Sequence, residues 1–125
     1  MFGLINQISQ QQEDGLLQAQ AIALMLLNFA ERNPGMTRVL IGDVLVNEDD
    51  RLQIRMNQFM ERLELAFKQA LRLAVTQNQA AENEVSCLAN LLCSVVVGRW
   101  HRYAKTGFKN LPGEQAALQL ALLLR

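Results

Sequence analysis

The stretch from Leu16 to Val46 reads LLQAQAIALMLLNFAERNPGMTRVLIGDVLV, and it decides the fold. Between residues 16 and 30 only two glutamines and one asparagine are polar, so a helix here would be apolar on almost every side. We therefore expect this helix at the centre of a bundle, with other helices around it. Pro34 ends the helix, because proline disfavours the α conformation at Asn33 and has no N–H to donate. Asn33 and Pro34 predict the cap and the first residue of a new helix, and so a sharp corner.

The composition of the 125-residue chain is typical of a helical protein. Half of the residues are apolar, 6% are aromatic, and there are only 2 prolines and 7 glycines. Leu, Ala, Gln and Met are abundant, and these residues favour helices, whereas so few turn residues would not serve an all-β fold. A chain of this length can bury a core without disulfides or metals. The sequence therefore predicts a single all-α domain, a helical bundle over residues 1–125.

Apolar residues at helical spacing predict five further helices around the central one. Four of them cover Phe2–Gln12, Pro34–Val46, Val85–Tyr103 and Glu114–Arg125. The fifth and longest begins after the polar residues 47–50 and carries an apolar stripe from Leu52 to Ala74. The polar segment 77–84 is the clearest loop.

The balanced net charge of the chain gives no general attraction to anionic partners. The chain has 12 basic and 12 acidic residues, so no global field favours nucleic acid or an acidic membrane. Residues 99–109 are nevertheless basic without any acid, through Arg99, Arg102, Lys105 and Lys109. This segment is either a solvated helix end, where cations complement the helix dipole, or a surface for an anionic partner. The apolar run at 16–30 is shorter than the roughly 20 residues of a membrane span, and no signal peptide is evident, so we expect a soluble, cytoplasmic protein.

No catalytic or metal-binding motif is recognisable in the sequence. His101 is the only histidine, and no nucleophile or orienting acid is placed beside it by the sequence, so we expect a structural or surface side chain. Cys87 and Cys93 are six residues apart, which turns them away from each other on a helix, and we expect both to be buried small hydrophobes in a reducing compartment. We expect neither an enzyme, nor a cofactor, nor a metal site.

Several short motifs carry a resemblance to a known family. They are ERNPG at residues 31–35, Thr37 and Arg38, DRLQ at residues 50–53, and the NQ and ER pairs at residues 57–58 and 61–62. Over residues 24–72 the chain resembles the C-terminal domain of TetR-type regulators, most closely those of nucleoid occlusion. The resemblance implies that the chain is the helical dimerisation and effector domain of a DNA-binding transcriptional regulator, of the type that regulates cell division.

The resemblance also implies a partner surface. In the nucleoid occlusion proteins, the Arg-Asn pair that matches Arg32 and Asn33 belongs to the surface that engages the division protein FtsZ. The residues that we expect at this surface are Met25, Asn28, Arg32, Asn33 and Arg38. The chain differs from that family at Asn28, where a glycine is usual, and at Leu4, which aligns with an arginine of the same surface. An alternative interpretation is that Arg32, Asn33 and Arg38 only close the end of the central helix.

Two further sites are predicted. A homodimer is expected through the last two helices, whose apolar residues exceed what one chain needs to close its core. Its interface residues would be Leu88, Leu92, Val95, Val96, Leu118, Ala121 and Leu122. TetR-type regulators often enclose a small hydrophobic ligand, and here Met25, Met56, Phe59 and Met60 would enclose it. Methionines at helical spacing are, however, more often residues that fill a packed core.

The helix-turn-helix that reads DNA in the family has no counterpart in this sequence. Because the first predicted helix begins at Phe2 with no capping residue ahead of it, we expect either that the chain has been cut or that its start codon was assigned too far downstream. Two alternatives stay open. The chain would be a self-standing helical interaction module without DNA binding, or the ligand-sensing domain of a repressor.

Overall fold

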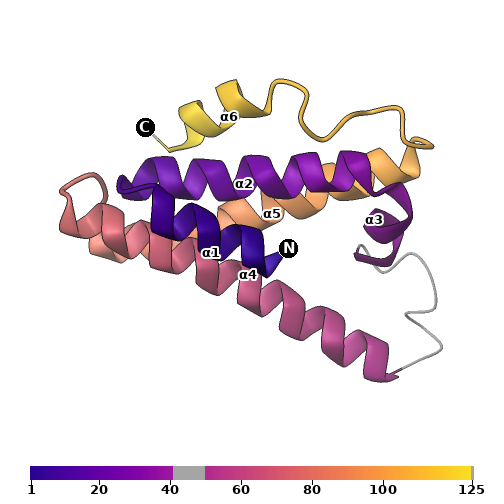
Figure 1. Ribbon diagram of the computed structural model, residues 1–125, viewed down its shortest axis with the longest axis horizontal. Coiled ribbons are helices and arrows are strands. Elements are labelled where there is room, and N and C mark those ends of the chain that lie inside the picture. The colour runs from indigo at the N-terminus through magenta and orange to yellow at the C-terminus, as the bar shows by residue number, and fades with distance from the viewer. Residues whose placement is uncertain (41–49, 125) are drawn as a thin grey trace.

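The structure, a computed structural model, describes residues 1–40 and 50–124. Within these ranges the chain forms α-helices, one 3-10 turn and no strand, so the all-α prediction is confirmed (Figure 1). The elements are α1 (Phe2–Gln11), α2 (Gly15–Arg32), α3 (Pro34–Leu40), α4 (Asp50–Thr76), η1 (Glu82–Glu84), α5 (Val85–Lys105) and α6 (Ala116–Leu123).

Helix α2 is the central element, as its sequence predicts. It packs against α1, α3, α4, α5 and α6, and Figure 1 shows it running between α6 above and α4 below. Its buried residues are Gly15, Gln18, Ala19, Ile22, Ala23, Leu26, Leu27 and Ala30. Because the apolar side chains among them face several neighbours at once, α2 holds the other helices together through burial of apolar surface.

The beginning of α2 is tied to the end of α4. Asp14 caps α2 as predicted, since its carboxylate accepts a hydrogen bond of 3.0 Å from the N–H of Leu17. That hydrogen bond is the main reason why the pKa of Asp14 lies below its ordinary value, and a hydrogen bond from the side chain of Gln79 adds a smaller effect. The N–H of Gly15 donates to Oε1 of Gln77 at 2.8 Å, and a Cβ on Gly15 would lie 2.2 Å from the nitrogen of Ala74. The two helix ends therefore approach more closely than any side chain at residue 15 would allow.

Helices α4 and α5 supply the other half of the core. The buried stripe of α4 consists of Leu63, Phe67, Ala70, Leu71 and Ala74, in agreement with the predicted face. On α5, Trp100 is fully buried and its indole Nε1 donates to the carbonyl oxygen of Leu26 at 3.0 Å. The prediction for the cysteines is wrong for Cys87, which is exposed, because it lies on the solvent side of the first turn of α5. Cys93 is half-buried.

Two predicted helices differ in extent. The last helix begins at Ala116 and not at Glu114, because the segment before it is bound to other elements. The guanidinium of Arg99 donates to the carbonyl oxygens of Pro112 and Glu114 at 2.7 and 2.9 Å, and the N–H of Gly113 donates to the Glu31 carboxylate at 2.7 Å. For the helix predicted at Pro34–Val46, the structure places α3 at Pro34–Leu40, and residues 41–46 lie outside the described residues. Among the described helices, none combines the length and the apolarity needed to cross a membrane.

Candidate partner-binding groove

A groove of about 470 Å³ lies between α1 and α2. Residues of both helices line it, namely Leu4 of α1 and Ala21, Leu24, Met25, Asn28, Phe29 and Arg32 of α2. The structure thus brings together Met25, Asn28 and Arg32, three of the five residues predicted for the partner surface.

The groove follows from the position of α2 in the bundle. Met25, Asn28 and Arg32 are three and four residues apart, so they share one face of the helix. The opposite face, with Ala23 and Ala30, is fully buried in the core. Because α1 covers only part of the remaining surface, the solvent side of an almost entirely apolar helix is left as the floor of the groove.

Carbonyl groups at the C-terminal end of α2 are bound by side chains, and this explains the role of Asn33. Its Nδ2 donates to the carbonyl oxygen of Phe29 at 2.8 Å, so Asn33 closes α2 and does not line the groove. The hydroxyl of Thr37 donates to the carbonyl oxygen of Ala30 at 3.1 Å, and that of Tyr103 donates to the carbonyl oxygen of Glu31 at 3.0 Å. Three successive carbonyl groups of the last turn therefore have partners, which fixes the corner between α2 and α3.

Among the described residues, Arg32 is the one charged side chain that lines the groove. It is exposed, and no described residue forms a hydrogen bond or an ion pair with its guanidinium. Its position in the last turn of α2 is favourable because a cation complements the negative end of the helix dipole. Arg38 is exposed on α3 and does not line the groove, so the structure does not bring it to this site.

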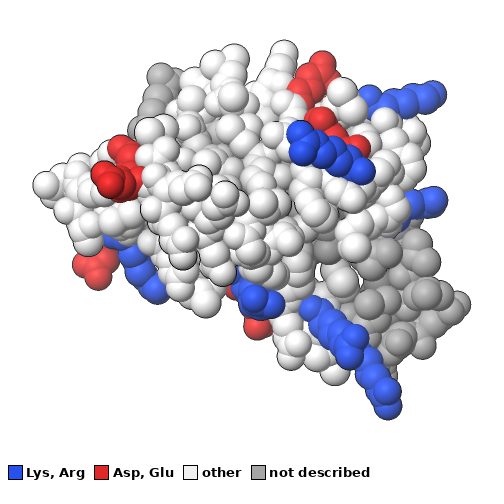
Figure 2. Space-filling model, in the orientation of Figure 1, with Lys and Arg blue, Asp and Glu red and all other residues white. Residues whose placement is uncertain are grey.

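The arrangement has the chemistry of a peptide-binding groove. An apolar floor with one amide and one guanidinium at its end fits an apolar segment that carries an acidic group. Figure 2 shows that the middle of the face seen there carries few charged atoms, while Lys and Arg side chains lie along the lower edge, over α4. His101 is exposed on α5, and the described residues contain no cluster of His, Cys, Asp and Glu that could hold a metal ion.

The predicted hydrophobic ligand cavity is not formed as expected. Met25 lines the groove on α2, whereas Met56, Phe59 and Met60 lie on α4 and pack, half-buried, against the core. Phe59 meets Phe2 of α1 edge-on, and none of the three residues lines the groove. The alternative interpretation of the methionines as core filler therefore describes Met56 and Met60 better.

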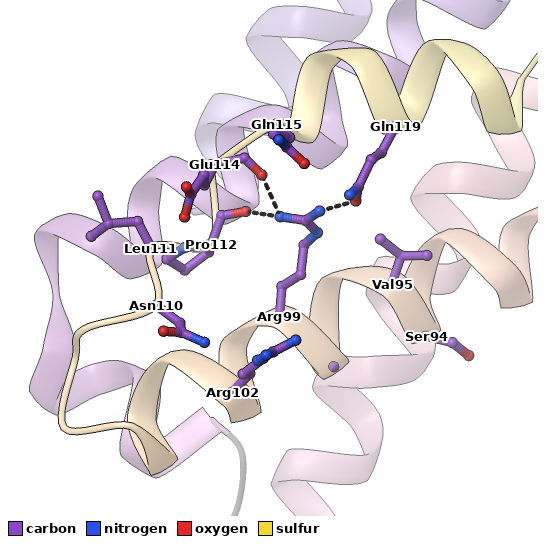
Figure 3. Close-up of a pocket in the computed structure, with 11 residues that line it drawn as sticks. Ser94, Val95, Arg99, Arg102, Asn110, Leu111, Pro112, Glu114, Gln115 and Gln119 are labelled. Carbon is purple, nitrogen blue, oxygen red and sulfur yellow. Dashed lines mark hydrogen bonds between the residues drawn. The ribbon is translucent and has the colours of Figure 1, made fainter.

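A second hollow, of about 610 Å³, lies between α5 and the segment that leads into α6 (Figure 3). Five residues of α5 line one wall, namely Ser94, Val95, Gly98, Arg99 and Arg102. The other wall is lined by Asn110, Leu111, Pro112, Glu114, Gln115 and Gln119. Arg99 crosses the hollow and donates to the carbonyl oxygens of Pro112 and Glu114 and to the side chain of Gln119 (Figure 3). Arg99 thus links α5 to the segment before α6 through hydrogen bonds. Arg102 and Lys105 lie in the last turn of α5, as expected if this basic segment is a helix end whose cations complement the helix dipole.

Residues predicted for the dimer interface divide into two groups. Leu92 and Val96 are completely buried within the chain, where they pack in the core, so they have no surface left for a partner and the prediction is wrong for these two. Leu88 is half-buried against the core and Val95 lines the second hollow. Leu118, Ala121 and Leu122 are exposed on α6, with 65% of Leu118 and 51% of Leu122 accessible to solvent.

Ala21, Leu24 and Phe29 also line the groove, although they were not predicted for the partner surface. Their positions follow the same helical spacing as Met25, Asn28 and Arg32, so this signal was present. What the sequence could not give was the placement of α1, whose Leu4 forms the opposite wall.

The comparisons with known proteins agree with this architecture. The SlmA-like family, described as tetracyclin repressor-like, C-terminal domain, matches residues 13–125. The chain is 41% identical over 116 residues to a protein of Idiomarina loihiensis, 40% over 121 residues to one of Sodalis glossinidius, and 39% over 124 residues to one of Aliivibrio fischeri. All three relatives are named nucleoid occlusion factor SlmA, which is not the name of an enzyme.

These alignments cover 92%, 96% and 98% of the chain, and 59%, 61% and 63% of the three relatives. The chain therefore spans about three fifths of the length of the curated relatives that it matches. The family match extends over all the described helices from α2 to α6, including the floor of the groove. The chain belongs to the SlmA-like family of tetracyclin repressor-like C-terminal domains.

Proposed function

We propose that this domain is the dimerisation and effector part of a TetR-type regulator of nucleoid occlusion, and that the groove between α1 and α2 binds a segment of the division protein FtsZ. Family membership and the names of the relatives support the first part. The observation that carries the second part is the meeting of Leu4, Met25, Asn28 and Arg32 in one groove. The resemblance had associated all four positions with the FtsZ surface.

The chemistry of the groove suggests how the segment is recognised. Leu24, Met25 and Phe29 offer apolar contact area, so burial of apolar side chains of the partner would supply most of the affinity. Arg32 would pair with a carboxylate, and the amide of Asn28 would accept and donate hydrogen bonds. Because Leu4 stands where the family has an arginine, the groove has one cation instead of two, and we expect recognition to depend on Arg32.

Biolayer interferometry with immobilised, purified FtsZ tests this proposal. The unmodified protein should bind, and Arg32→Asp should weaken binding at least about tenfold, because a like charge would meet the acidic group of the segment. Arg72→Asp is the matched control, since Arg72 is exposed on α4, makes the same charge change and does not line the groove. Arg72→Asp should keep the melting temperature of the parent. Arg32→Asp should lower it by only a few degrees, because an anion in the last turn of α2 opposes the helix dipole.

Asn33→Ala separates the cap from the contact surface. It should lower the unfolding free energy by about 1 kcal/mol, through loss of the hydrogen bond to Phe29, which Arg32→Asp leaves intact. Absence of FtsZ binding by the unmodified protein, or equal binding by Arg32→Asp and Arg72→Asp, would contradict the proposal.

The homodimer and the DNA are further parts of the proposed function. Exposed leucines on α6 beside the second hollow support a two-fold interface through Val95, Leu118, Ala121 and Leu122, with Leu88 at its edge. DNA would be bound by a part of the regulator that this chain does not span, and the protein would act in the cytoplasm, at the nucleoid.

A further inference from the structure

We propose that Arg62 of α4 is a positioning residue of the groove, although it does not line it, and that it acts through Phe2 of α1. This inference rests on the proposed function of the groove. The Cζ atom of Arg62 lies 3.8 Å from the centroid of the Phe2 ring. The same ring meets Phe59 edge-on, with centroids 5.4 Å apart and ring planes at 69°. Arg62 and Phe59, both on α4, thus hold the first residue of α1.

Helix α1 is held at both ends by different means. At its C-terminal end, Nε2 of the buried Gln18 donates to the carbonyl oxygens of Ser9 and Gln12 at 3.2 and 2.9 Å. Between the two ends, Ile5 is buried in the core. At the N-terminal end, the contacts with Arg62 and Phe59 are the ring interactions that tie α1 to α4.

The N-terminal end of α1 is also the end that forms the groove. Leu4 is the groove residue that α1 contributes, and it lies two positions after Phe2. Residues two apart on a helix are rotated by about 200° around its axis, so they point to nearly opposite sides. Phe2 therefore faces α4 while Leu4 faces the groove. Any shift of this end of α1 therefore moves the groove wall, and the Arg62 contact fixes the width of the groove before a partner arrives.

The contact also gives a role to one of the pairs by which the sequence resembles its family, the Glu61 and Arg62 pair. Glu61 is exposed beside it, and the guanidinium of Arg62 lies over the Phe2 ring. A cation over an aromatic face is attracted by the quadrupole of the ring. At an exposed site this attraction corresponds to roughly a two- to fivefold change in an equilibrium constant.

The test is a mutant cycle that is measured as FtsZ affinity by biolayer interferometry. Arg62→Ala should weaken binding about two- to fivefold, and Arg62→Lys, which keeps a cation, should restore most of the affinity. In a Phe2→Leu background, Arg62→Ala should have no further effect, because the ring through which it acts is gone. Arg55→Ala, an exposed arginine of α4 outside the groove, is the control and should bind like the parent.

Hydrogen exchange supplies a readout that does not depend on FtsZ. Amides of α1 should exchange faster in Arg62→Ala than in the parent or in Arg55→Ala, while those of α2 should not change. Absence of FtsZ binding by the parent would remove the proposed function of the groove. If the parent binds, three results would overturn the positioning role of Arg62. Arg62→Ala would bind FtsZ as tightly as the parent, or it would lose as much affinity in the Phe2→Leu background as in the parent. The third result is that the amides of α1 exchange at the same rate in Arg62→Ala as in the parent.

Discussion

The indole Nε1 of Trp100 on α5 donates a 3.0 Å hydrogen bond to the carbonyl oxygen of Leu26 on α2, across 74 residues of sequence. Both side chains are completely buried, so the bond is made where water cannot replace it. Leu26 is turned about 100° from Met25, toward the buried side of α2. The bond therefore fixes α2, which forms the floor of the groove, from its side that faces the core.

Trp100→Phe removes this bond and leaves an aromatic ring in the core. We expect the unfolding free energy to fall by about 2 kcal/mol, of which roughly 1 kcal/mol is the hydrogen bond and the rest is the smaller ring. Urea unfolding followed by circular dichroism measures the change, and the denaturant slope should stay constant. His101→Gln, at the exposed neighbouring position, is the control and should unfold like the parent. A Trp100→Phe protein as stable as the control would show that the bond contributes nothing.

Gly15→Ala should be among the most destabilising single substitutions in this chain. The added Cβ would lie 2.2 Å from the nitrogen and 2.6 Å from the Cα of Ala74, which are backbone atoms and can yield only if α2 and α4 separate. We expect a loss of about 3 kcal/mol or more, measured by thermal unfolding. Gly3→Ala is the matched control, because no atom lies within 4 Å of its Cβ position, and it should leave the melting temperature equal or slightly higher.

Local patterns predicted the helices well and their contacts less well. The central place of α2 follows from an apolar run without a polar face, and the Asp14 cap follows from its residue type. Leu92 and Val96 show the limit, because an apolar helix face looks the same whether it is covered by its own chain or by a second copy. Only the placement of α2 against α5 distinguishes these cases.

The same limit applies to the site. Met25, Asn28 and Arg32 share a helix face, so the sequence could place them together. Asn33 adjoins them in the sequence, but its side chain turns back to the carbonyl oxygen of Phe29, and no pattern distinguishes such a cap from a partner contact. The contact of Arg62 with Phe2 joins positions far apart in the sequence, and it required the fold.

The two thiols should differ in reactivity. Burial raises the pKa of Cys93 to about 12, with the negative charge of Glu64 adding to the effect, whereas Cys87 is exposed. Because the thiolate is the reactive form, Ellman's reagent at pH 8 should modify Cys87 quickly and Cys93 slowly, and both quickly in urea. Cys87→Ser should lose the fast phase and Cys93→Ser the slow one. Two thiols that react together in the folded protein would refute this difference.

The raised pKa of Cys93 also predicts the direction of a pH effect. A thiol with a higher pKa in the folded state favours folding as long as it is protonated in both states. This contribution is complete below the ordinary value of 9.0 and is lost as the pH rises toward 12. The unfolding free energy should therefore fall more steeply over this range for the parent than for Cys93→Ser.

The second hollow and the exposed leucines of α6 predict a homodimer. Ala116, Leu120 and Leu124 are buried within the chain, whereas Leu118 and Leu122 on the other side of α6 are largely exposed. An apolar face of this kind is a liability on a monomer, and in two-fold symmetry it can bury against its own copy.

Leu122→Glu places a carboxylate at the centre of that interface. Burial of an unpaired charge costs several kcal/mol, so the variant should be monomeric at low micromolar concentration, where the parent should be a dimer. Size-exclusion chromatography with light scattering measures both masses, and circular dichroism verifies that the variant keeps its helices. Ile54→Glu makes the same change at an exposed position on α4, a helix that α2 separates from α6 in Figure 1, and should stay dimeric. A monomeric parent, or a dimer that survives Leu122→Glu, would remove this face from consideration as the interface.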